Sequence, residues 1–277
     1  MGPGVFDGLR ERLGARREVL SVPLAGYAGT PPCEPCTIGR LAERAAAGAP
    51  PRCVVIGWSL GAQVALQWAS TAPQQVAKLV LTAATPCFVQ REGWTCAMER
   101  RVFDEFATTL EDDADATLRR FAMLQAHGDI QRKAVARYLT SHVERSPTND
   151  IERKEGRFKE GNLGFPLWRS SASHAQRGFR FASPTLRETS RETLRETLRE
   201  TLDVLLHSDL RSVLPRIQQP TLIVHGEHDA LVPLAAAEYL ARALPDARLR
   251  VIAGAAHAPF VSDETAVAGA IAEFIDD

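Results

Sequence analysis

Hydrophobic and polar positions along the chain follow two patterns, short apolar runs and apolar residues at helical spacing. Together they predict alternating strands and helices at both ends of the sequence. Short apolar runs at residues 53–56, 77–81 and 221–225 are typical of strands buried on both faces, and residues 249–252 predict another strand. A similar run at residues 19–24 predicts a further strand. Apolar residues at helical spacing predict helices over residues 5–13, 38–47, 60–72, 234–244 and 264–275. This order favours an α/β fold with a mostly parallel sheet and helices on both faces.

The middle of the chain shows only the helical spacing of apolar residues. Residues 98–110, 116–125 and 130–143 each have apolar positions at helical spacing, with no strand pattern between them. A helical segment inserted between two parts of an α/β fold is typical of a cap domain. We therefore expect residues 1–86 to form the first part of the core, residues 87–207 an inserted helical cap, and residues 208–277 the second part of the core.

A low-complexity insertion is expected inside the cap, at about residues 148–202. Residues 152–180 are rich in Gly, Ser and basic residues, and the interleaved aromatic residues could stack on RNA. A solvated insertion is the favoured interpretation, because the charge of the whole chain is balanced. Residues Leu186 to Leu202 repeat the tetrapeptide Leu-Arg-Glu-Thr with one Ser variant, a spacing that permits a short amphipathic helix. We assign these repeats no function.

Composition narrows the class of protein further. The 277 residues include 33 Lys and Arg against 34 Asp and Glu, and a net charge of −1 does not suit a nucleic-acid partner. No apolar run approaches the roughly 20 residues that span a bilayer, so no membrane association is expected. The sequence does not begin with the cationic and then apolar stretch of a secretory signal. The five cysteines are sparse and odd in number, which does not suggest a set of disulfides. We therefore expect a cytoplasmic protein with reduced thiols.

The strongest chemical signal is Gly57-Trp58-Ser59-Leu60-Gly61, between a predicted strand and a predicted helix. This G-x-S-x-G pattern in that context is typical of a sharp turn that presents a nucleophilic serine above the sheet edge. The turn forces a strained backbone at Ser59, and side chains at positions 57 and 61 are expected to collide with neighbouring backbone. The N–H of Leu60 would donate to the oxyanion of the reaction intermediate.

A serine nucleophile needs a base and a group that orients the base, and in this kind of hydrolase the chain order is Ser, acid, His. The candidate acid is Asp229, just after the run at residues 221–225, and the candidate base is His257, just after the run at residues 249–252. Both follow strands at their carboxyl ends, where open α/β sheets bind ligands. Glu227 is the second candidate for the acid.

Other candidates carry weaker arguments. Asp203 and Asp209 follow no predicted strand, and His127, His142, His174 and His207 fall in the cap or the insertion and are expected to be ordinary polar residues. His225 and His228 could ligate a metal, but no third ligand with suitable spacing accompanies them. The pair Cys33 and Cys36 lacks the second CxxC of a zinc site. We expect no metal and no cofactor.

Several segments together resemble the pimeloyl-acyl-carrier-protein methyl ester esterases of biotin synthesis, a family of α/β-hydrolases. The turn and the three candidate catalytic residues indicate only the superfamily. The resemblance to the esterases is carried by Thr85-Pro86-Cys87-Phe88, the segment Arg120 to Gln125, Ser208-Asp209-Leu210-Arg211 and Ala256-His257-Ala258-Pro259-Phe260. It covers about residues 1–147 and 203–277.

This resemblance implies a reaction and a partner. Ser59 would attack the methyl ester of a pimeloyl chain carried by acyl carrier protein, with His257 as base and Asp229 orienting it. The residues implied to bind substrate are Trp58, Phe88, Phe121, Ala122, Met123, Leu124 and Gln125. Acyl carrier protein is acidic, and the basic residues implied to bind it are Arg120, Lys133 and Arg137. The enzyme is expected to act as a monomer.

One departure from the family pattern concerns the beginning of the chain. The family starts with two or three strands and a His-Gly-Trp-type loop that supplies a second oxyanion donor. Residues Met1 to Phe6 align just after that loop, so the N-terminal strands are expected to be missing. A general short-acyl ester hydrolase and an inactive truncated hydrolase scaffold therefore stay open as alternative functions.

Overall fold

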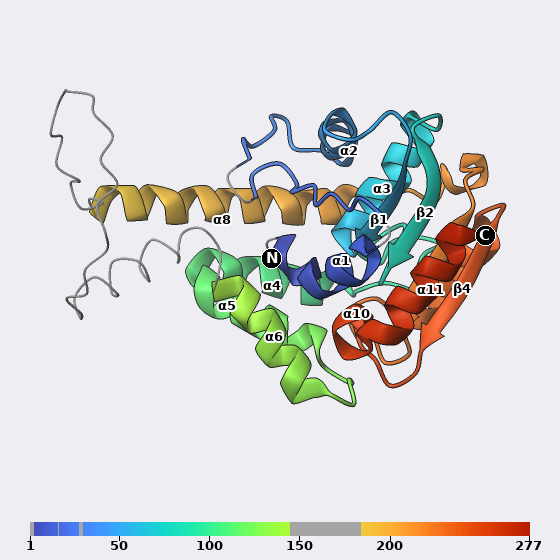
Figure 1. Cartoon of the computed structure of the whole chain (residues 1–277). Helices are drawn as coiled ribbons and strands as arrows, with labels where there is room; N and C mark the ends of the chain where they lie inside the picture. Colours follow the sequence, from blue (N-terminus) through green and yellow to red (C-terminus); the bar gives the residue numbers. More distant parts are fainter. Residues whose placement is uncertain (1–2, 16, 28–29, 145–183) are drawn as a thin grey trace, which may run out of the picture.

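The computed structural model describes residues 3–15, 17–27, 30–144 and 184–277, and the strands of these residues form one parallel sheet (Figure 1). The sheet order is β1-β2-β3-β4. The strands are β1 (Cys53–Trp58), β2 (Val76–Thr82), β3 (Thr221–Gly226) and β4 (Ala247–Ile252). Since all four run in parallel, their carboxyl ends meet at one edge.

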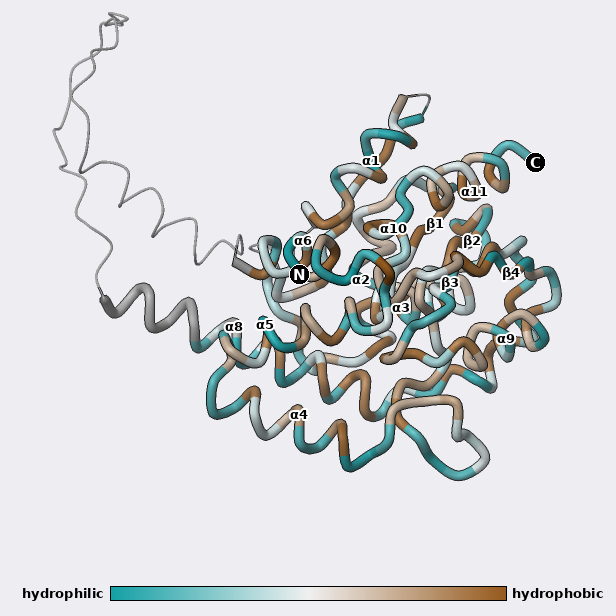
Figure 2. Tube along the Cα trace, turned by 90° about the horizontal axis from the view of Figure 1, so that it is seen from below, coloured by the Kyte–Doolittle hydropathy of each residue, from teal (hydrophilic) through white to brown (hydrophobic). Residues whose placement is uncertain are grey.

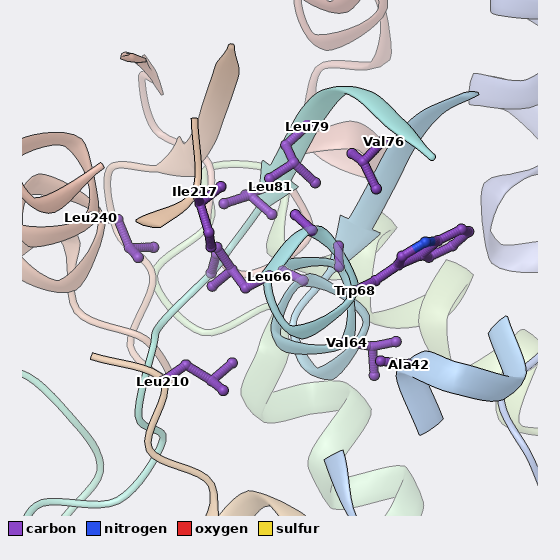
Figure 3. Packing of buried hydrophobic residues seen from close by; sticks show 14 of the residues in the cluster. Ala42, Val64, Leu66, Trp68, Val76, Leu79, Leu81, Leu210, Ile217 and Leu240 are labelled. Carbon is purple, nitrogen blue, oxygen red and sulfur yellow. The ribbon is translucent and has the colours of Figure 1, made fainter. Parts of the chain in front are cut away.

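Helices cover both faces of this sheet, as the alternation of side chains along β2 shows. Leu79 and Leu81 face a cluster that includes residues of α2, α3 and α9 (Figure 3). Val80, between them, faces a second cluster that includes residues of α1 and α11. Successive strand residues point to opposite faces, so a strand buried on both sides is apolar throughout. The predicted mostly parallel sheet with helices on both faces is confirmed.

The helices of the α/β frame lie close to their predicted ranges. They are α1 (Asp7–Gly14), α2 (Ile38–Ala47), α3 (Leu60–Thr71), α9 (Leu234–Ala243) and α11 (Glu264–Asp276). The structure adds a short helix that the sequence does not predict, α10 (Pro259–Ser262), and the 3-10 turns η1 (Pro3–Phe6) and η2 (Leu214–Arg216). Figure 2 shows hydrophobic stretches along β1 and β2, whereas hydrophilic and hydrophobic stretches alternate along α4, a helix of the cap. No helix in the described ranges is long and apolar enough to cross a membrane.

The predicted cap is helical in its described part. Its helices are α4 (Arg100–Asp112), α5 (Ala114–Gln125), α6 (Arg132–Glu144) and α8 (Pro184–His207). α8 packs beside α4 and extends past it (Figure 1), and it contains the Leu-Arg-Glu-Thr repeats, so the helix permitted by the repeat spacing forms. The predictions for residues 152–180 lie outside the described residues, and the domain boundaries stay predictions.

The predicted strand at residues 19–24 is wrong. These residues have no helix or strand assignment, and Leu20 and Val22 are 55% and 41% exposed. Pro23 offers no N–H to a strand ladder, and within the described part of the chain no strand pairs with this segment. A short apolar run does not become a strand without a neighbour to hydrogen-bond.

Two of the segments that carry the family resemblance meet at the base of the cap. The N–H of Leu210 donates to the carbonyl of Pro86 at 2.9 Å, and the indole N–H of Trp94 donates to the carbonyl of Cys87 at 2.9 Å. Arg211 pairs with Asp209 and lies over the Trp94 ring, and these hydrogen bonds lower the pKa of Asp209 despite its partial burial. The contact of Arg211 with Trp94 thus joins the predicted second part of the core to the predicted cap.

Candidate active site

Ser59 occupies a sharp turn between β1 and α3, and its backbone is in a conformation that few residues adopt. Its φ and ψ are 55° and −117°. A Cβ at Gly57 would lie 2.3 Å from the carbonyl oxygen of Gly61, so only glycine fits there. The expected collision at Gly61 is wrong, because a Cβ at Gly61 would have nothing within 4 Å. The glycine at position 61 is thus not required by space in the described structure.

This difference between the two glycines gives a stability prediction. Gly57→Ala is expected to lower the free energy of unfolding by about 3 kcal/mol, because backbone atoms cannot yield as a flexible side chain can. Gly61→Ala, inside α3, is the matched control and is expected to be neutral or slightly stabilising, since alanine favours helices. Urea unfolding of the two variants measures the difference. Equal losses in both variants would contradict the packing described for the turn.

Ser59, His257 and Asp229 form a continuous chain of hydrogen bonds at the carboxyl edge of the sheet. His257 Nε2 lies 3.0 Å from Ser59 Oγ, and His257 Nδ1 lies 2.8 Å from Asp229 Oδ2. His257 and Asp229 are 1% and 6% exposed, whereas Ser59 is half-buried. The three residues predicted from separate segments of the sequence are therefore brought together in the geometry of a nucleophile, a base and an orienting acid.

Asp229 is held in one orientation by its own loop. Its Oδ1 accepts the N–H groups of Leu231 and Val232, each at 2.9 Å, which leaves Oδ2 directed at His257. Burial alone would raise the pKa of Asp229, but the nearby His257, its hydrogen bond and the Val232 N–H outweigh burial and lower it. The carboxylate is thus ionised at neutral pH.

Glu227, the second candidate for the acid, points elsewhere. Its Oε2 accepts the N–H of Gly254 at 2.9 Å, and the side chain is half-exposed. His225 lies beside the acid, with Nε2 at 3.5 Å from Asp229 Oδ2 and 2.9 Å from the carbonyl oxygen of Val232. It is fully buried, and burial lowers the pKa of His225, so it is a neutral neighbour of Asp229. Among the described residues no group of three His, Cys, Asp or Glu side chains gathers as a metal site would.

Leu60 is the first residue of α3, directly after Ser59. The first N–H groups of a helix have no partner inside it, and the helix dipole favours negative charge at that end. The N–H of Leu60 is therefore available beside Ser59 for a developing oxyanion, as the sequence predicts. Its role as the oxyanion donor stays a prediction.

Trp58 contacts His257 directly. Its indole N–H donates to the backbone carbonyl of His257 at 2.8 Å, and its ring packs edge-on against Phe6 and Phe260. Phe88, also predicted to bind substrate, is 6% exposed and packs against Phe103 in the cap. Both positions suit a structural role as well, and the substrate contacts predicted for them stay predictions.

The residues of the predicted substrate segment, Phe121 to Gln125, lie on different sides of the helix α5. Ala122 and Gln125 are buried, Phe121 is half-buried against Phe106, and Met123 and Leu124 are exposed. The backbone carbonyl of Gln125 accepts the N–H of His257 at 3.2 Å, which brings the end of α5 to the catalytic histidine. A common lining role for all five residues stays a prediction.

The predicted carrier-protein residues lie on two neighbouring helices of the cap. Arg120 belongs to α5, Lys133 and Arg137 belong to α6, and all three side chains are exposed. The two helices pack against each other. Their role in binding acyl carrier protein stays a prediction.

Comparison with known proteins gives the family of this chain. Residues 40–264 match the family model of the alpha/beta hydrolase fold. The chain is 33% identical over 262 residues to the pimeloyl-[acyl-carrier protein] methyl ester esterase of Nitrosomonas europaea, an alignment that covers 95% of this chain and 86% of that protein. It is also 33% identical over 267 residues to the same esterase of Aromatoleum aromaticum, covering 95% of this chain and 89% of that protein. This chain belongs to the pimeloyl-[acyl-carrier protein] methyl ester esterase family.

Solved structures support the fold of this esterase. An esterase from Exiguobacterium antarcticum superposes with a TM-score of 0.74 at 18% identity, covering 100% of this chain and 88% of that one. An enol-lactonase from Burkholderia xenovorans superposes with a TM-score of 0.66 at 16% identity, covering 100% of this chain and 87% of that one. At such low identity these likenesses show the fold alone. Membership of the esterase family identifies the chain as a carboxylic ester hydrolase.

One residue that the sequence did not single out lies against the catalytic loops. Asp129, in the turn between α5 and α6, is 6% exposed, and its Oδ2 accepts the N–H of Ala256 at 2.9 Å. Ala256 directly precedes His257. No periodicity or motif connects positions 129 and 256, so only the folded chain reveals this contact.

Proposed function

We propose that this esterase hydrolyses the methyl ester of pimeloyl-acyl-carrier protein, with Ser59 as nucleophile, His257 as base and Asp229 as the orienting acid. The observation that carries the proposal is the unbroken hydrogen-bonded chain from Ser59 through His257 to Asp229, in a member of this esterase family. The relatives from Nitrosomonas europaea and Aromatoleum aromaticum are named for the same acyl carrier protein ester. The enzyme would act in the cytoplasm.

The geometry supports a two-step reaction. As Ser59 Oγ attacks the ester carbonyl, its proton passes to His257 Nε2, 3.0 Å away. The negative charge on the carbonyl oxygen would be stabilised by the N–H of Leu60. His257 then protonates the departing methoxide, and methanol leaves an acyl-enzyme on Ser59. Water, deprotonated by the same nitrogen, attacks the acyl-enzyme and releases the free pimeloyl carboxylate with regeneration of Ser59.

The direct test compares substrates. Purified enzyme is incubated with pimeloyl-acyl-carrier protein methyl ester, and mass spectrometry measures loss of the methyl group from the carrier protein. We expect kcat/KM for this ester to exceed that for short p-nitrophenyl esters. If the short esters are turned over more efficiently, the enzyme is a general short-acyl esterase. If neither ester is hydrolysed by well-folded protein, the chain is an inactive scaffold.

Charge reversal on α5 and α6 tests the carrier-protein partner. The triple change of Arg120, Lys133 and Arg137 to Glu is expected to lower kcat/KM for the carrier-protein ester by about 10- to 100-fold, mainly through KM, because an acidic partner would then be repelled. Hydrolysis of short p-nitrophenyl esters should stay unchanged. Steady-state kinetics with both substrates measure the difference, and added salt should weaken it.

The matched control for this change is Arg40→Glu. Arg40 is exposed on α2, which packs on the opposite face of the sheet from α5 and α6. It should leave both activities unchanged. Equal turnover of the carrier-protein ester by the triple variant and the unmodified enzyme would contradict the predicted docking surface.

A further inference from the structure

The turn between α5 and α6 holds a buried carboxylate that joins three separate segments. Asp129 Oδ2 accepts the N–H of Ala256 at 2.9 Å, while Oδ1 accepts the hydroxyl of Ser262 at 3.0 Å and the N–H of Gln131 at 2.7 Å. Ala256 belongs to the loop that ends at His257, Ser262 belongs to α10, and Gln131 belongs to the turn itself. Asp129 therefore connects the cap to both ends of the segment that carries the catalytic histidine.

Neighbouring contacts strengthen this connection. The N–H of Ile130 donates to the carbonyl of Gly254 at 2.9 Å, and the side-chain amide of Gln131 donates to the carbonyl of Ser262 at 2.9 Å. Figure 1 shows α6 and α10 close together, in agreement with the packing between them. The turn thus lies along the loop of residues 254–257 rather than touching it at one point.

The orientation of His257 depends on how this loop is held. Its imidazole must bridge Ser59 Oγ and Asp229 Oδ2 at 3.0 Å and 2.8 Å, so a small displacement of its backbone breaks one of the two contacts. The carbonyl of His257 is fixed by Trp58, and its N–H by the carbonyl of Gln125. The preceding peptide group, that of Ala256, is fixed by Asp129.

We propose that Asp129 is a positioning residue for ester hydrolysis: by holding the peptide N–H of Ala256, it keeps His257 aligned between Ser59 and Asp229. Asp129 suits this role because its two oxygens can satisfy donors from all three segments at once. Its burial excludes water that would compete for those donors. A misplacement of about 1 Å in a catalytic group can cost about 10²-fold in rate.

The test compares three variants with short p-nitrophenyl esters as substrate. Asp129→Ala removes every acceptor and is expected to lower kcat by about 10- to 100-fold with little change in KM. Asp129→Asn keeps one carbonyl oxygen, which can still accept the N–H of Ala256 while the amide N–H₂ faces the Ser262 hydroxyl. It leaves the N–H of Gln131 unpaired, so it should restore most of kcat although it lowers the melting temperature.

Ser262→Ala is the matched control, because it removes one hydrogen bond of Asp129 but leaves the bond to Ala256. It should lower the melting temperature and leave kcat unchanged. Active-site titration with a fluorophosphonate gives the concentration of folded enzyme, so each kcat refers to competent molecules only. A purely structural role for Asp129 would lower the melting temperature and the titrated fraction but leave kcat per titrated molecule unchanged in all three variants, and that result would overturn the proposal.

The proposal rests on the catalytic role proposed for His257, and the two can fail separately. If Ser59→Ala keeps its esterase activity, the assignment of the catalytic residues is wrong. If Ser59→Ala is inactive but Asp129→Ala retains full kcat, only the positioning role of Asp129 is wrong.

Discussion

Replacing Ser59 with alanine is expected to lower kcat for ester hydrolysis by about 10⁶-fold, the size of loss seen when a serine protease loses its nucleophile. The variant lacks the hydroxyl oxygen that lies 3.0 Å from His257 Nε2, so no acyl-enzyme can form at this position. Substrate binding should be retained, because KM depends on contacts away from the reacting atom. Steady-state hydrolysis of a short p-nitrophenyl ester and of the carrier-protein ester measures the loss.

The fold should tolerate this change. The side chain of Ser59 hydrogen-bonds to His257, and alanine fits the volume of serine in the strained turn. Ser70→Ala, in the same helix as Leu60 and near its other end, is the matched control and should leave kcat unchanged. A fluorophosphonate should label the unmodified enzyme and the control but not the Ser59 variant. Residual activity above about 1% in well-folded Ser59→Ala would mean that another nucleophile does the chemistry.

The catalytic residues could be predicted because each lies in or directly after a segment whose local sequence predicts its structure. The turn around Ser59 needs a glycine at position 57 on steric grounds, and Asp229 and His257 follow the strands β3 and β4, which the sequence predicts. Parallel strands then deliver both residues to the same edge of the sheet. The order of Ser, acid and His along the chain removes most other combinations.

Features that depend on distant contacts could not be predicted in this way. Residues 19–24 look like a strand locally, but a strand also needs a partner, which the sequence does not show. The space around Gly61 likewise depends on what packs there and not on its neighbours in sequence. Asp129 reaches Ala256 across 127 positions of the chain, and nothing in either segment marks the contact.

Within the cap, the sequence likewise could not predict which residues of one helix are buried. The resemblance implies that Phe121 to Gln125 all bind substrate, but one turn of helix cannot direct five consecutive side chains to one cleft. Met123 and Leu124 are exposed, whereas Ala122 and Gln125 are buried. The helical period therefore separates the buried members of this segment from the exposed ones.

Replacing Asp229 with asparagine is the second large effect that we expect, a loss of about 10⁴-fold in kcat. The size of this loss in kcat follows from which carboxylate oxygen of Asp229 is held by backbone N–H groups of its loop. Asp229 Oδ1 accepts the N–H groups of Leu231 and Val232, so the carbonyl oxygen of an asparagine must occupy that side. The opposite orientation would leave two buried N–H groups facing an N–H₂ group, at a cost of about 1–3 kcal/mol each.

The amide N–H₂ then faces His257 Nδ1, where Asp229 Oδ2 accepts a hydrogen bond in the unmodified enzyme. His257 Nδ1 must become an acceptor, and the proton of the neutral imidazole moves to Nε2. That nitrogen, directed at Ser59 Oγ, can no longer take the serine proton. The variant is therefore expected to fold and bind substrate but to hold its histidine in the wrong tautomer.

The carboxylate of Asp229 also contributes to stability in a pH-dependent way. Because its pKa is lowered in the folded state, it stabilises the protein at pH values above its ordinary pKa of about 4, and this contribution is lost as the pH falls through the lowered value. The asparagine variant has no such ionisation. Its free energy of unfolding should accordingly fall less steeply than that of the unmodified enzyme as the pH drops below about 4.

Glu227→Gln is the control that decides between the two candidate acids. Glu227 lies two positions from Asp229, but its carboxylate accepts the N–H of Gly254 instead of facing His257. A glutamine can keep that bond through its carbonyl oxygen, so kcat should stay unchanged. Steady-state kinetics at neutral pH, with stability measured in parallel, compare the two variants. If Glu227→Gln loses activity as severely as Asp229→Asn, the acid that orients His257 has been assigned to the wrong residue, and the hydrogen bond of 2.8 Å between Asp229 and His257 does not carry the catalytic function.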